Sequence, residues 1–242
     1  MKSISIIIPI YNYEKLIVTK LKKIIKKIKE YKIKYEIILI DDCSQDSTFF
    51  LLQNFIKNKK NIRLFKNSNN KGKSYSVKRG LKVSKYNHVL FIDCDLPYFN
   101  KINEVIKKLK NNFDFVAINR RLEKSKLKST NLSIYQYIRH FLGFLISEII
   151  MFTLNLNIEA CDTQAGLKGF KKNLVINKNF ISNKFFLDLE LIIFFTKLKK
   201  KIHFISTKYE VPKESSIKIF DFKNLLIIAE LLKVIIKYRK LI

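Results

Sequence analysis

The chain lacks the patterns that are typical of several common classes of protein. Its 242 residues include three cysteines, Cys43, Cys94 and Cys161, whose spacing matches no metal site and fits a reducing compartment. No G-x-G-x-x-G or Walker A pattern occurs, so neither a dinucleotide-binding fold nor a P-loop is predicted. No run of about 18 uncharged apolar residues occurs, so we expect no membrane-spanning helix. The N-terminus leads directly into an apolar run, and we expect no signal peptide.

Acidic residues are scarce relative to basic ones. The chain has 48 lysines and arginines against 20 aspartates and glutamates, a formal net charge of +28. Such a charge favours nucleic acid, an anionic membrane or a phosphorylated ligand as partner. With only five glycines and many lysines, isoleucines and asparagines, the composition is itself biased, so part of the charge is explained equally well as solvated helix surface.

Short apolar runs alternate with segments of helical period over the first hundred residues. Four runs predict buried strands, and they cover residues 3–10, 35–40, 61–65 and 88–92. Three intervening segments have the apolar spacing of helices, and they cover residues 15–31, 45–57 and 74–83. Such alternation predicts an α/β fold with a mostly parallel central sheet flanked by helices.

Two aspartates, Asp93 and Asp95, directly follow the apolar run 88–92. Carboxylates at this spacing can hold one divalent cation, Mg²⁺ or Mn²⁺, although a polar turn explains the pair alone equally well. The predicted strands 3–10 and 35–40 also end in polar loops, at Tyr11–Glu14 and Asp41–Ser44. Because the ends of parallel strands meet at one edge of a sheet, these loops predict a crevice that suits a nucleotide.

Four motifs in order resemble the family 2 glycosyltransferases of the GT-A fold. They are residues 5–12, the segment Asp41–Thr48, the segment from Asn70 to Gly80 and the Asp93-Cys94-Asp95 triplet. Three later motifs resemble the polyprenyl-phosphate glycosyltransferases, especially the dolichyl-phosphate beta-glucosyltransferase branch. They are Asn119-Arg120-Arg121, Asp162-Thr163-Gln164 and Phe186–Glu190.

The resemblance implies a role for each motif. Residues expected to bind the nucleotide-sugar are Pro9, Tyr11, Asn12, Glu14, Asp41, Asp42, Lys71, Lys73 and Asp93. Asp93 and Asp95 are expected to hold the metal, and Arg120, Arg121 and Arg139 to bind an acceptor phosphate, since the guanidinium fork matches phosphate. Asp162 and Asp188, with Arg139, are the catalytic candidates. Two departures are Tyr13, where relatives often have an acidic residue, and Pro97, which cannot coordinate a metal through its side chain.

The implied activity is inverting transfer of a hexose from a nucleotide-sugar, preferably a UDP-sugar, to a polyprenyl or dolichyl phosphate. One alternative is transfer to a glycan hydroxyl in surface polysaccharide synthesis, which would require Asp162 or Asp188 as a base. A remote alternative is a basic nucleic-acid-binding protein, but no RNA-type aromatic motif is present and we expect no nucleic-acid partner.

Two apolar segments bear on membranes. We expect residues 1–216 to form the GT-A domain and 217–242 to form a basic amphipathic helix, suited to an anionic membrane surface. The segment 141–156 is also apolar on most faces. Together they predict a peripheral protein at the cytoplasmic face of a membrane. Alternatively, both segments pack on the core or on a partner, either a membrane protein or a second copy of the chain.

Overall fold

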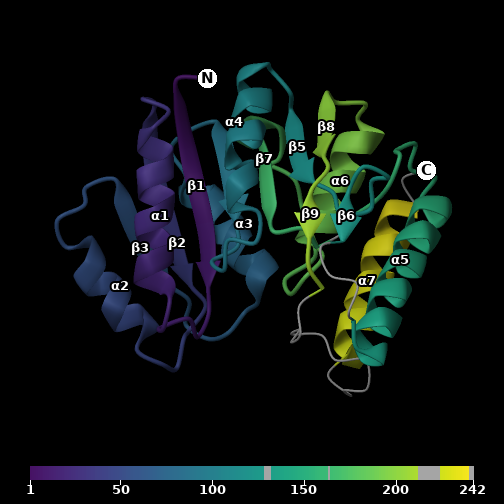
Figure 1. Ribbon diagram of the computed structural model, residues 1–242, viewed down its shortest axis with the longest axis horizontal. Helices are drawn as coiled ribbons and strands as arrows, with labels where there is room; N and C mark the ends of the chain where they lie inside the picture. The colour runs from purple at the N-terminus through teal and green to yellow at the C-terminus, as the bar shows by residue number, and fades with distance from the viewer. Residues whose placement is uncertain (128–131, 163, 212–223, 240–242) are drawn as a thin grey trace.

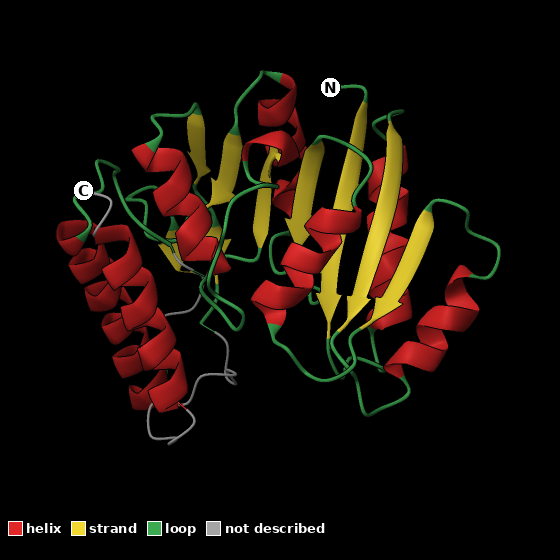
Figure 2. Ribbon diagram, turned by 180° about the vertical axis from the view of Figure 1, so that it is seen from behind, coloured by secondary structure: helices red, strands yellow, loops and turns green. Residues whose placement is uncertain are grey.

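The computed structural model describes residues 1–127, 132–162, 164–211 and 224–239. Its centre is a seven-stranded sheet of order β3-β2-β1-β4-β7-β5-β8, in which β7 alone runs antiparallel to its neighbours (Figures 1 and 2). The strands are β1 Ser3–Ile10, β2 Lys34–Asp41, β3 Ile62–Lys66, β4 His88–Ile92, β5 Phe115–Ile118, β7 Leu167–Lys171 and β8 Ile202–Ile205. The mostly parallel α/β sheet predicted from the sequence is therefore confirmed.

Helices cover both faces of this sheet (Figures 1 and 2). They are α1 Ile17–Lys29, α2 Thr48–Ile56, α3 Lys73–Val83, α4 Ile102–Lys110, α5 Ile134–Thr153, α6 Leu187–Lys197 and α7 Asn224–Arg239. Two short 3₁₀ turns lie at Phe99–Lys101 and Lys172–Leu174, and β6 Lys126–Leu127 pairs with β9 Lys208–Tyr209 in a small second sheet. The predicted helices over 15–31, 45–57 and 74–83 match α1, α2 and α3 to within three residues at each end.

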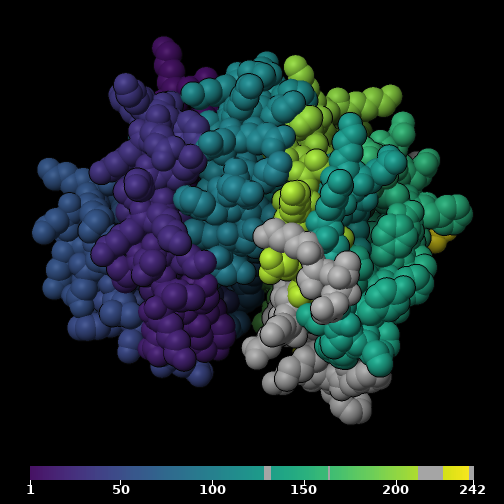
Figure 3. Space-filling model, viewed as in Figure 1, coloured from purple at the N-terminus to yellow at the C-terminus, as the bar shows by residue number. Residues whose placement is uncertain are grey.

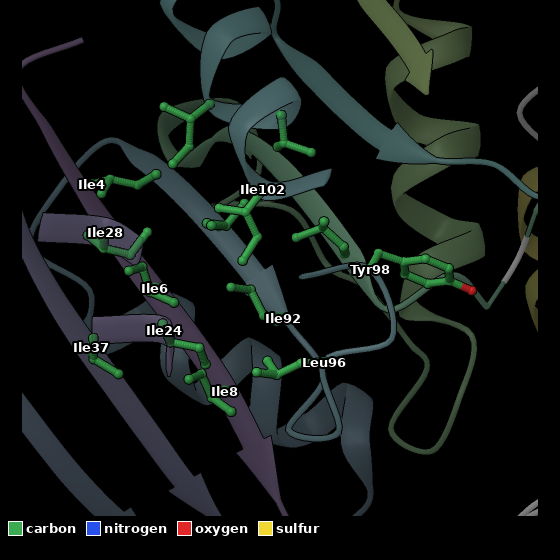
Figure 4. Close-up of a cluster of buried hydrophobic side chains, with 14 of the residues drawn as sticks. Ile4, Ile6, Ile8, Ile24, Ile28, Ile37, Ile92, Leu96, Tyr98 and Ile102 are labelled. Atoms are coloured by element: carbon green, nitrogen blue, oxygen red, sulfur yellow. The ribbon is translucent and has the colours of Figure 1, made fainter. Parts of the chain in front are cut away.

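Alternation along β1 divides the core into two layers, because successive strand side chains point to opposite faces. Ile4, Ile6 and Ile8 pack with α1 and α4, while Ile7 packs on the other face with α3 and α6. Figure 4 shows the first of these layers, with the isoleucines of β1 directed at Ile24 and Ile28 of α1. Burial on both faces explains why β1 and β2 are near-continuous apolar runs in the sequence.

Helices α5 and α7 pack against each other at one end of the sheet (Figure 1). Helix α5 begins with a capping box, in which Ser133 Oγ accepts from Gln136 N and the Gln136 side chain accepts from Ser133 N. Helix α7 contributes Val234 and Tyr238 to the core. Among the described residues no helix is both long and apolar enough to cross a membrane. The predicted tail helix 217–242 lies in part outside the described residues, which include 224–239 of it.

Candidate active site

The carboxyl ends of β1, β2 and β4 lie side by side, which brings the predicted donor loops together. Strand β1 pairs with both β2 and β4, and Asp41 lies opposite Ile10 in the register. Asp42 continues this pairing, since its N–H donates to the Ile10 carbonyl at 2.8 Å. Residues 30 to 80 positions apart in the sequence therefore meet at one sheet edge, as the strand order requires.

The loops after β1 and β2 are bonded to each other. Asn12 has a left-handed backbone, φ 46°, and its side-chain oxygen accepts from Gln45 N at 2.9 Å. Its own N–H donates to Ser44 Oγ at 2.9 Å. The Glu14 carboxylate accepts from Ser47 N at 2.8 Å, just before α2. Asn12 and Glu14 thus hold the two loops in register, while Tyr11 remains exposed.

The two aspartates after β2 have different partners. Asp42 is buried, and its carboxylate accepts from Lys71 N at 3.0 Å, Gly72 N at 2.7 Å and the Asn67 amide at 2.6 Å. It therefore fixes the loop that carries Lys71. Asp41 is fully buried; one oxygen accepts from Ser44 N at 3.1 Å, and the other has no hydrogen-bond partner among the described residues. Asp41 thus retains an unused acceptor beside the donor loops.

The acidic pair at the end of β4 is held closely on one side. Lys73 Nζ lies 2.8 Å from Asp93 Oδ1, and Asp93 N donates to the Gly166 carbonyl at 2.9 Å. A Cβ at Gly166 would lie 1.8 Å from Asp93 Oδ2, so only glycine permits this approach. The Asp95 side chain is exposed and makes no ion pair within the described residues. Partial desolvation, and then the charge of Asp93, raise the pKa of Asp95.

Asp188 lies between two lysines in a network that reaches the acidic pair. Lys168 Nζ is 2.8 Å from Asp188 Oδ1, and Lys73 Nζ is 3.7 Å from Asp188 Oδ2. Both Asp188 and Lys168 are buried. Although burial opposes it, the charges of Asp93 and Asp188 raise the pKa of Lys73. These contacts engage the carboxylate of Asp188, one of the catalytic candidates, in ion pairs.

Arg120 and Asp162 form a bidentate ion pair beside the end of β5. Arg120 Nε and Nη2 lie 2.7 and 2.8 Å from the two Asp162 oxygens, and Arg120 N donates to the same carboxylate at 2.9 Å. Asp162 is buried, and although burial opposes it, the Arg120 guanidinium holds the pKa of that carboxyl well below its usual range. Asp162 is therefore ionised and fully engaged, which makes it a poor proton acceptor near neutral pH.

The other two predicted acceptor arginines contact aromatic rings of α5. The Arg121 guanidinium lies 5.8 Å from the Phe144 ring centre, and that of Arg139 lies 5.9 Å from the Tyr135 ring centre. Burial, and then the Arg121 and Arg120 charges, lower the pKa of His140 on the same helix. A positively charged region thus lies where the end of β5 meets α5.

Sequence reasoning missed two side chains near these groups, Lys168 and Tyr98. Lys168 is a fully buried charge at the second position of β7, and a buried lysine in a strand could have been a signal. Burial raises the pKa of Tyr98 to about 12, and its charged neighbours include Arg120 and Asp162 as well as the acidic pair. Figure 4 shows the Tyr98 hydroxyl directed away from the apolar cluster that holds its ring. No sequence pattern indicated Tyr98.

The residues present fit a hard divalent cation, though only in part. Within the described residues no group of three or more histidine, cysteine, aspartate or glutamate side chains could hold a metal. Asp93 and Asp95 offer two hard oxygen ligands. Desolvation and then the charge of Asp93 raise the pKa of Asp95, and a bound cation would oppose both effects. Beyond the side chains of these described residues, the substrate and water could supply further ligands.

Comparisons with known proteins agree with this geometry. A dolichyl-phosphate beta-glucosyltransferase of Trichomonas vaginalis is 27% identical over 98% of this chain and 74% of its own. A poly(ribitol-phosphate) beta-N-acetylglucosaminyltransferase, TarP of Staphylococcus aureus, is 30% identical over 87% of this chain and 62% of its own.

The fold matches that of glucosyl-3-phosphoglycerate synthase from Mycobacterium tuberculosis, crystallised with Mn²⁺, UDP-glucose and phosphoglyceric acid. The TM-score is 0.65 at 16% sequence identity, over 97% of this chain and 80% of that one. The fold is thus the GT-A fold that the motifs resemble. The profile of the family described as Glycosyl transferase family 2 matches residues 5–170, more than half of the sequence. The chain therefore belongs to glycosyl transferase family 2, and it is a glycosyltransferase.

Proposed function

We propose that this enzyme transfers a hexose, with inversion, from a nucleotide-sugar to a polyprenyl phosphate. The observation that carries the acceptor class is the state of the two candidate bases. Asp162 is locked in a bidentate ion pair with Arg120, and Asp188 lies between Lys168 and Lys73. A hydroxyl acceptor needs a base to remove its proton, whereas a phosphate is already an anion near neutral pH. The site therefore suits a phosphate.

On the donor side, we assign the diphosphate to the region of Lys73 and the acidic pair. A divalent cation there, Mg²⁺ or Mn²⁺, would supply Lewis-acid stabilisation of the leaving group. Asp93 and Asp95 would hold it, and Lys73, already paired with Asp93, would place a second positive charge beside the diphosphate. Lys71 is anchored through its backbone by Asp42, so its side chain can approach the same charge.

We assign the base of the nucleotide to the loops after β1 and β2. Tyr11 is exposed there with Pro9 just before it, and Asn12 and Glu14 hold the loop. Asp41 has a buried acceptor oxygen without a partner, an arrangement that costs about 1–3 kcal/mol. The imide N–H of uracil would satisfy this oxygen, which is why we favour a UDP-sugar. The structural neighbour from Mycobacterium tuberculosis was crystallised with UDP-glucose.

On the acceptor side, we assign the phosphate to Arg121 and Arg139, with Arg120 fixed beside them by Asp162. All three lie at the end of β5 or on α5, where a guanidinium can bind phosphate oxygens through two parallel hydrogen bonds. The name of the Trichomonas relative states the same acceptor class, dolichyl phosphate. Asp162 in this account positions Arg120.

A polyprenyl phosphate lies in a bilayer, so the site must meet a membrane. Apolar side chains on the outer surfaces of α5 and α7 are exposed, among them Phe141, Phe152, Leu226 and Leu232. Figure 3 shows α5 along the flank of the molecule, open to its surroundings. We propose that these two helices contact the cytoplasmic face of an anionic membrane while residues 1–216 carry the site, with lysines on α7 drawn to the lipid headgroups. A membrane-protein partner or second copy would compete for this face.

A second candidate is transfer to a glycan hydroxyl in surface polysaccharide synthesis. In its favour, the TarP relative is named for a polymeric acceptor, poly(ribitol-phosphate). The similarity to that relative covers 87% of this chain. This candidate needs a free base, and both Asp162 and Asp188 would first have to leave their ion pairs.

The test is a panel of nucleotide-sugars, with UDP-, GDP- and dTDP-hexoses, incubated with a short polyprenyl phosphate and Mn²⁺. We expect one donor to give an acid-labile glycolipid of inverted anomeric configuration, and EDTA to abolish its formation. Unchanged turnover in EDTA would reject the metal assignment. Transfer only to added glycan would favour the second candidate.

A further inference from the structure

Five consecutive backbone N–H groups before α6 are held by two glutamate carboxylates. We call this segment, Ile181–Phe185, the brace loop. Its first two N–H groups donate to Glu190 of α6, at 3.0 and 2.8 Å. Its last three donate to Glu230 of α7, at 2.7, 2.8 and 3.2 Å. Bonds to an ionised carboxylate are stronger than neutral ones, so a loop without regular structure is fixed at every residue.

The carbonyl groups of the brace loop hold the first turn of α3. Tyr75 N donates to the Asn183 carbonyl at 2.9 Å, and Ser74 N donates to the Lys184 carbonyl at 3.1 Å. These are N–H groups that a helix cannot satisfy internally. Gly72, at φ 97°, packs so closely that a Cβ there would lie 2.6 Å from the Asn183 oxygen. The brace loop therefore acts as the template on which α3 begins.

Lys73, the first residue of α3, reaches the donor site. Its Nζ contacts Asp93 at 2.8 Å and Asp188 at 3.7 Å. A continuous series of contacts thus runs from Glu230 through the brace loop and the start of α3 to the acidic pair. Each link is a hydrogen bond or an ion pair, and the series crosses from the helix layer at the end of the sheet to the donor side.

Glu230 is suited to this task by its place on α7. It is the only acidic residue in 224–239. Helix α7 is itself seated through Val234 in the core and through the Tyr238 hydroxyl, which lies 3.2 Å from Glu190. A movement of α7 would therefore displace Glu230, and with it three of the five N–H contacts of the brace loop.

We propose that Glu230 is a positioning residue for the donor site, acting through the brace loop on Lys73. The inference rests on the proposed function for its catalytic consequence, because that function assigns the donor diphosphate to Lys73. It adds that the α5 and α7 helix layer and the donor site are coupled, so that the seating of α7 determines how well Lys73 is held.

Amide hydrogen exchange of the full chain tests the coupling without reference to activity. In Glu230→Gln we expect the amides of Ser74 and Tyr75 to exchange about tenfold faster, with Glu230→Asp intermediate, because a charged carboxylate on a shorter arm is retained. Lys233→Gln changes one charge on the exposed side of α7, whose proposed role is toward lipid headgroups, and in the absence of lipid it is the matched control, with exchange as in the wild type. Amides in β1 should not change in any variant.

Two results would overturn the proposal. One is faster exchange in residues 183–185 alone, with Ser74 and Tyr75 protected as in the wild type. The other is a uniform increase that includes β1, which would mean global destabilisation. Should Glu230→Gln fail to fold, Glu230→Asp decides between the same results.

Binding of UDP-glucose with Mn²⁺ separates this inference from the proposed function. We expect the Kd to rise about three- to tenfold in Glu230→Gln and to be unchanged in Lys233→Gln. Equal affinity in Glu230→Gln and wild type would contradict the role of Glu230. A wild type that binds no nucleotide-sugar would contradict the proposed function, while the exchange data would still decide the coupling.

Discussion

Helices α1 and α5 show how differently the two ends of the molecule treat apolar residues. Helix α1 buries its whole apolar stripe, Ile17, Leu21, Ile24 and Ile28, and presents lysines to solvent. Helix α5 is longer and more apolar, yet buries only Ser147 and Ile150, and Phe152 is 90% exposed. A soluble surface rarely displays so many large apolar side chains together. Helix α1 therefore packs against the sheet, whereas α5 exposes the apolar surface that we propose contacts a membrane.

The same contrast extends to the sites at each end. On the proposed donor side, the side chains of Asp42, Asn12 and Glu14 accept hydrogen bonds from loop backbone N–H groups and so fix the loops. On the acceptor side, Arg121 and Arg139 lie against aromatic rings of α5. Fixed donor loops and an acceptor region beside an apolar surface are what transfer from a soluble donor to a lipid phosphate requires.

The largest effect should come from the acidic pair. Asp95→Asn removes a charge from the proposed metal ligands without changing shape, and we expect transfer to fall by about 10³-fold. Initial rates over a Mn²⁺ titration measure this loss. The control is Asp114→Asn, because Asp114 comes just before β5, at the edge of the sheet opposite to the acidic pair. Full activity in Asp95→Asn would remove the metal from the donor side.

A somewhat smaller loss should follow Gly166→Ala. The added methyl would lie 1.8 Å from Asp93 Oδ2, so the carboxylate must move while the charges stay the same. We expect a loss of about 10²-fold in transfer, since a displacement of about 1 Å at a reacting site costs this much. Steady-state rates and the melting temperature measure it together. A variant with wild-type rates would show that the position of Asp93 is not critical.

The Arg120–Asp162 ion pair should make the unfolding free energy depend on pH in the acid range. The pKa of Asp162 in the folded state lies below its unfolded value of about 3.9. The ion pair therefore contributes its full stabilisation above that unfolded value, and this stabilisation is lost as the pH falls through the folded-state pKa. Asp162→Asn should therefore cost about 3 kcal/mol at pH 7. The difference from wild type should shrink below about pH 4.

Urea unfolding at pH 7 and at pH 3 measures the difference in unfolding free energy between wild type and Asp162→Asn at each pH. Because Asp162 is already ionised in the folded enzyme, it should contribute no step to the rate between pH 5 and 8. A difference in stability that is the same at both pH values would mean that the ion pair contributes little.

The smallest effect that we expect is on membrane binding, and it distinguishes the exposed surface of α5 from that of α2. Phe152→Ser on α5 should weaken binding to anionic vesicles about tenfold, since burying one such side chain is worth at least about 1.5 kcal/mol. Phe50→Ser on α2 is the control, because Phe50 is also largely exposed but lies on the donor side. Sedimentation with vesicles measures both. An equal loss in the two variants would contradict a preferred membrane face at α5.

Much of the fold followed from local patterns. The continuous apolar runs of β1 and β2 are typical of strands buried on both faces, and α1 to α3 have regular helical spacing. The starts of α1 and α2 are predicted too early, because polar residues such as Lys15 and Gln45 continue the pattern without joining the helix. The antiparallel β7 was not visible, since its short run Leu167–Lys171 contains two lysines and a glycine.

The candidate site was predicted as a set of residues but not as a set of partners. Asp93, Lys73 and Asp188 were each named, yet their contacts with one another and with Lys168 depend on tertiary packing. Likewise Arg120 and Asp162 were predicted separately, and their pairing is what changes the chemistry available to Asp162. Tyr98 and Glu230 had no local signal, because their roles arise from elements far away in the sequence.

The central claim is that the acceptor is an anion that needs no base. A direct test compares two acceptors with the same prenyl chain, one ending in phosphate and one in hydroxyl. Both are assayed with the nucleotide-sugar that the donor panel identifies. We expect transfer to the phosphate alone, with a rate that is nearly independent of pH between 7 and 8.5. Transfer to the alcohol at a comparable rate, or rising with pH, would contradict it.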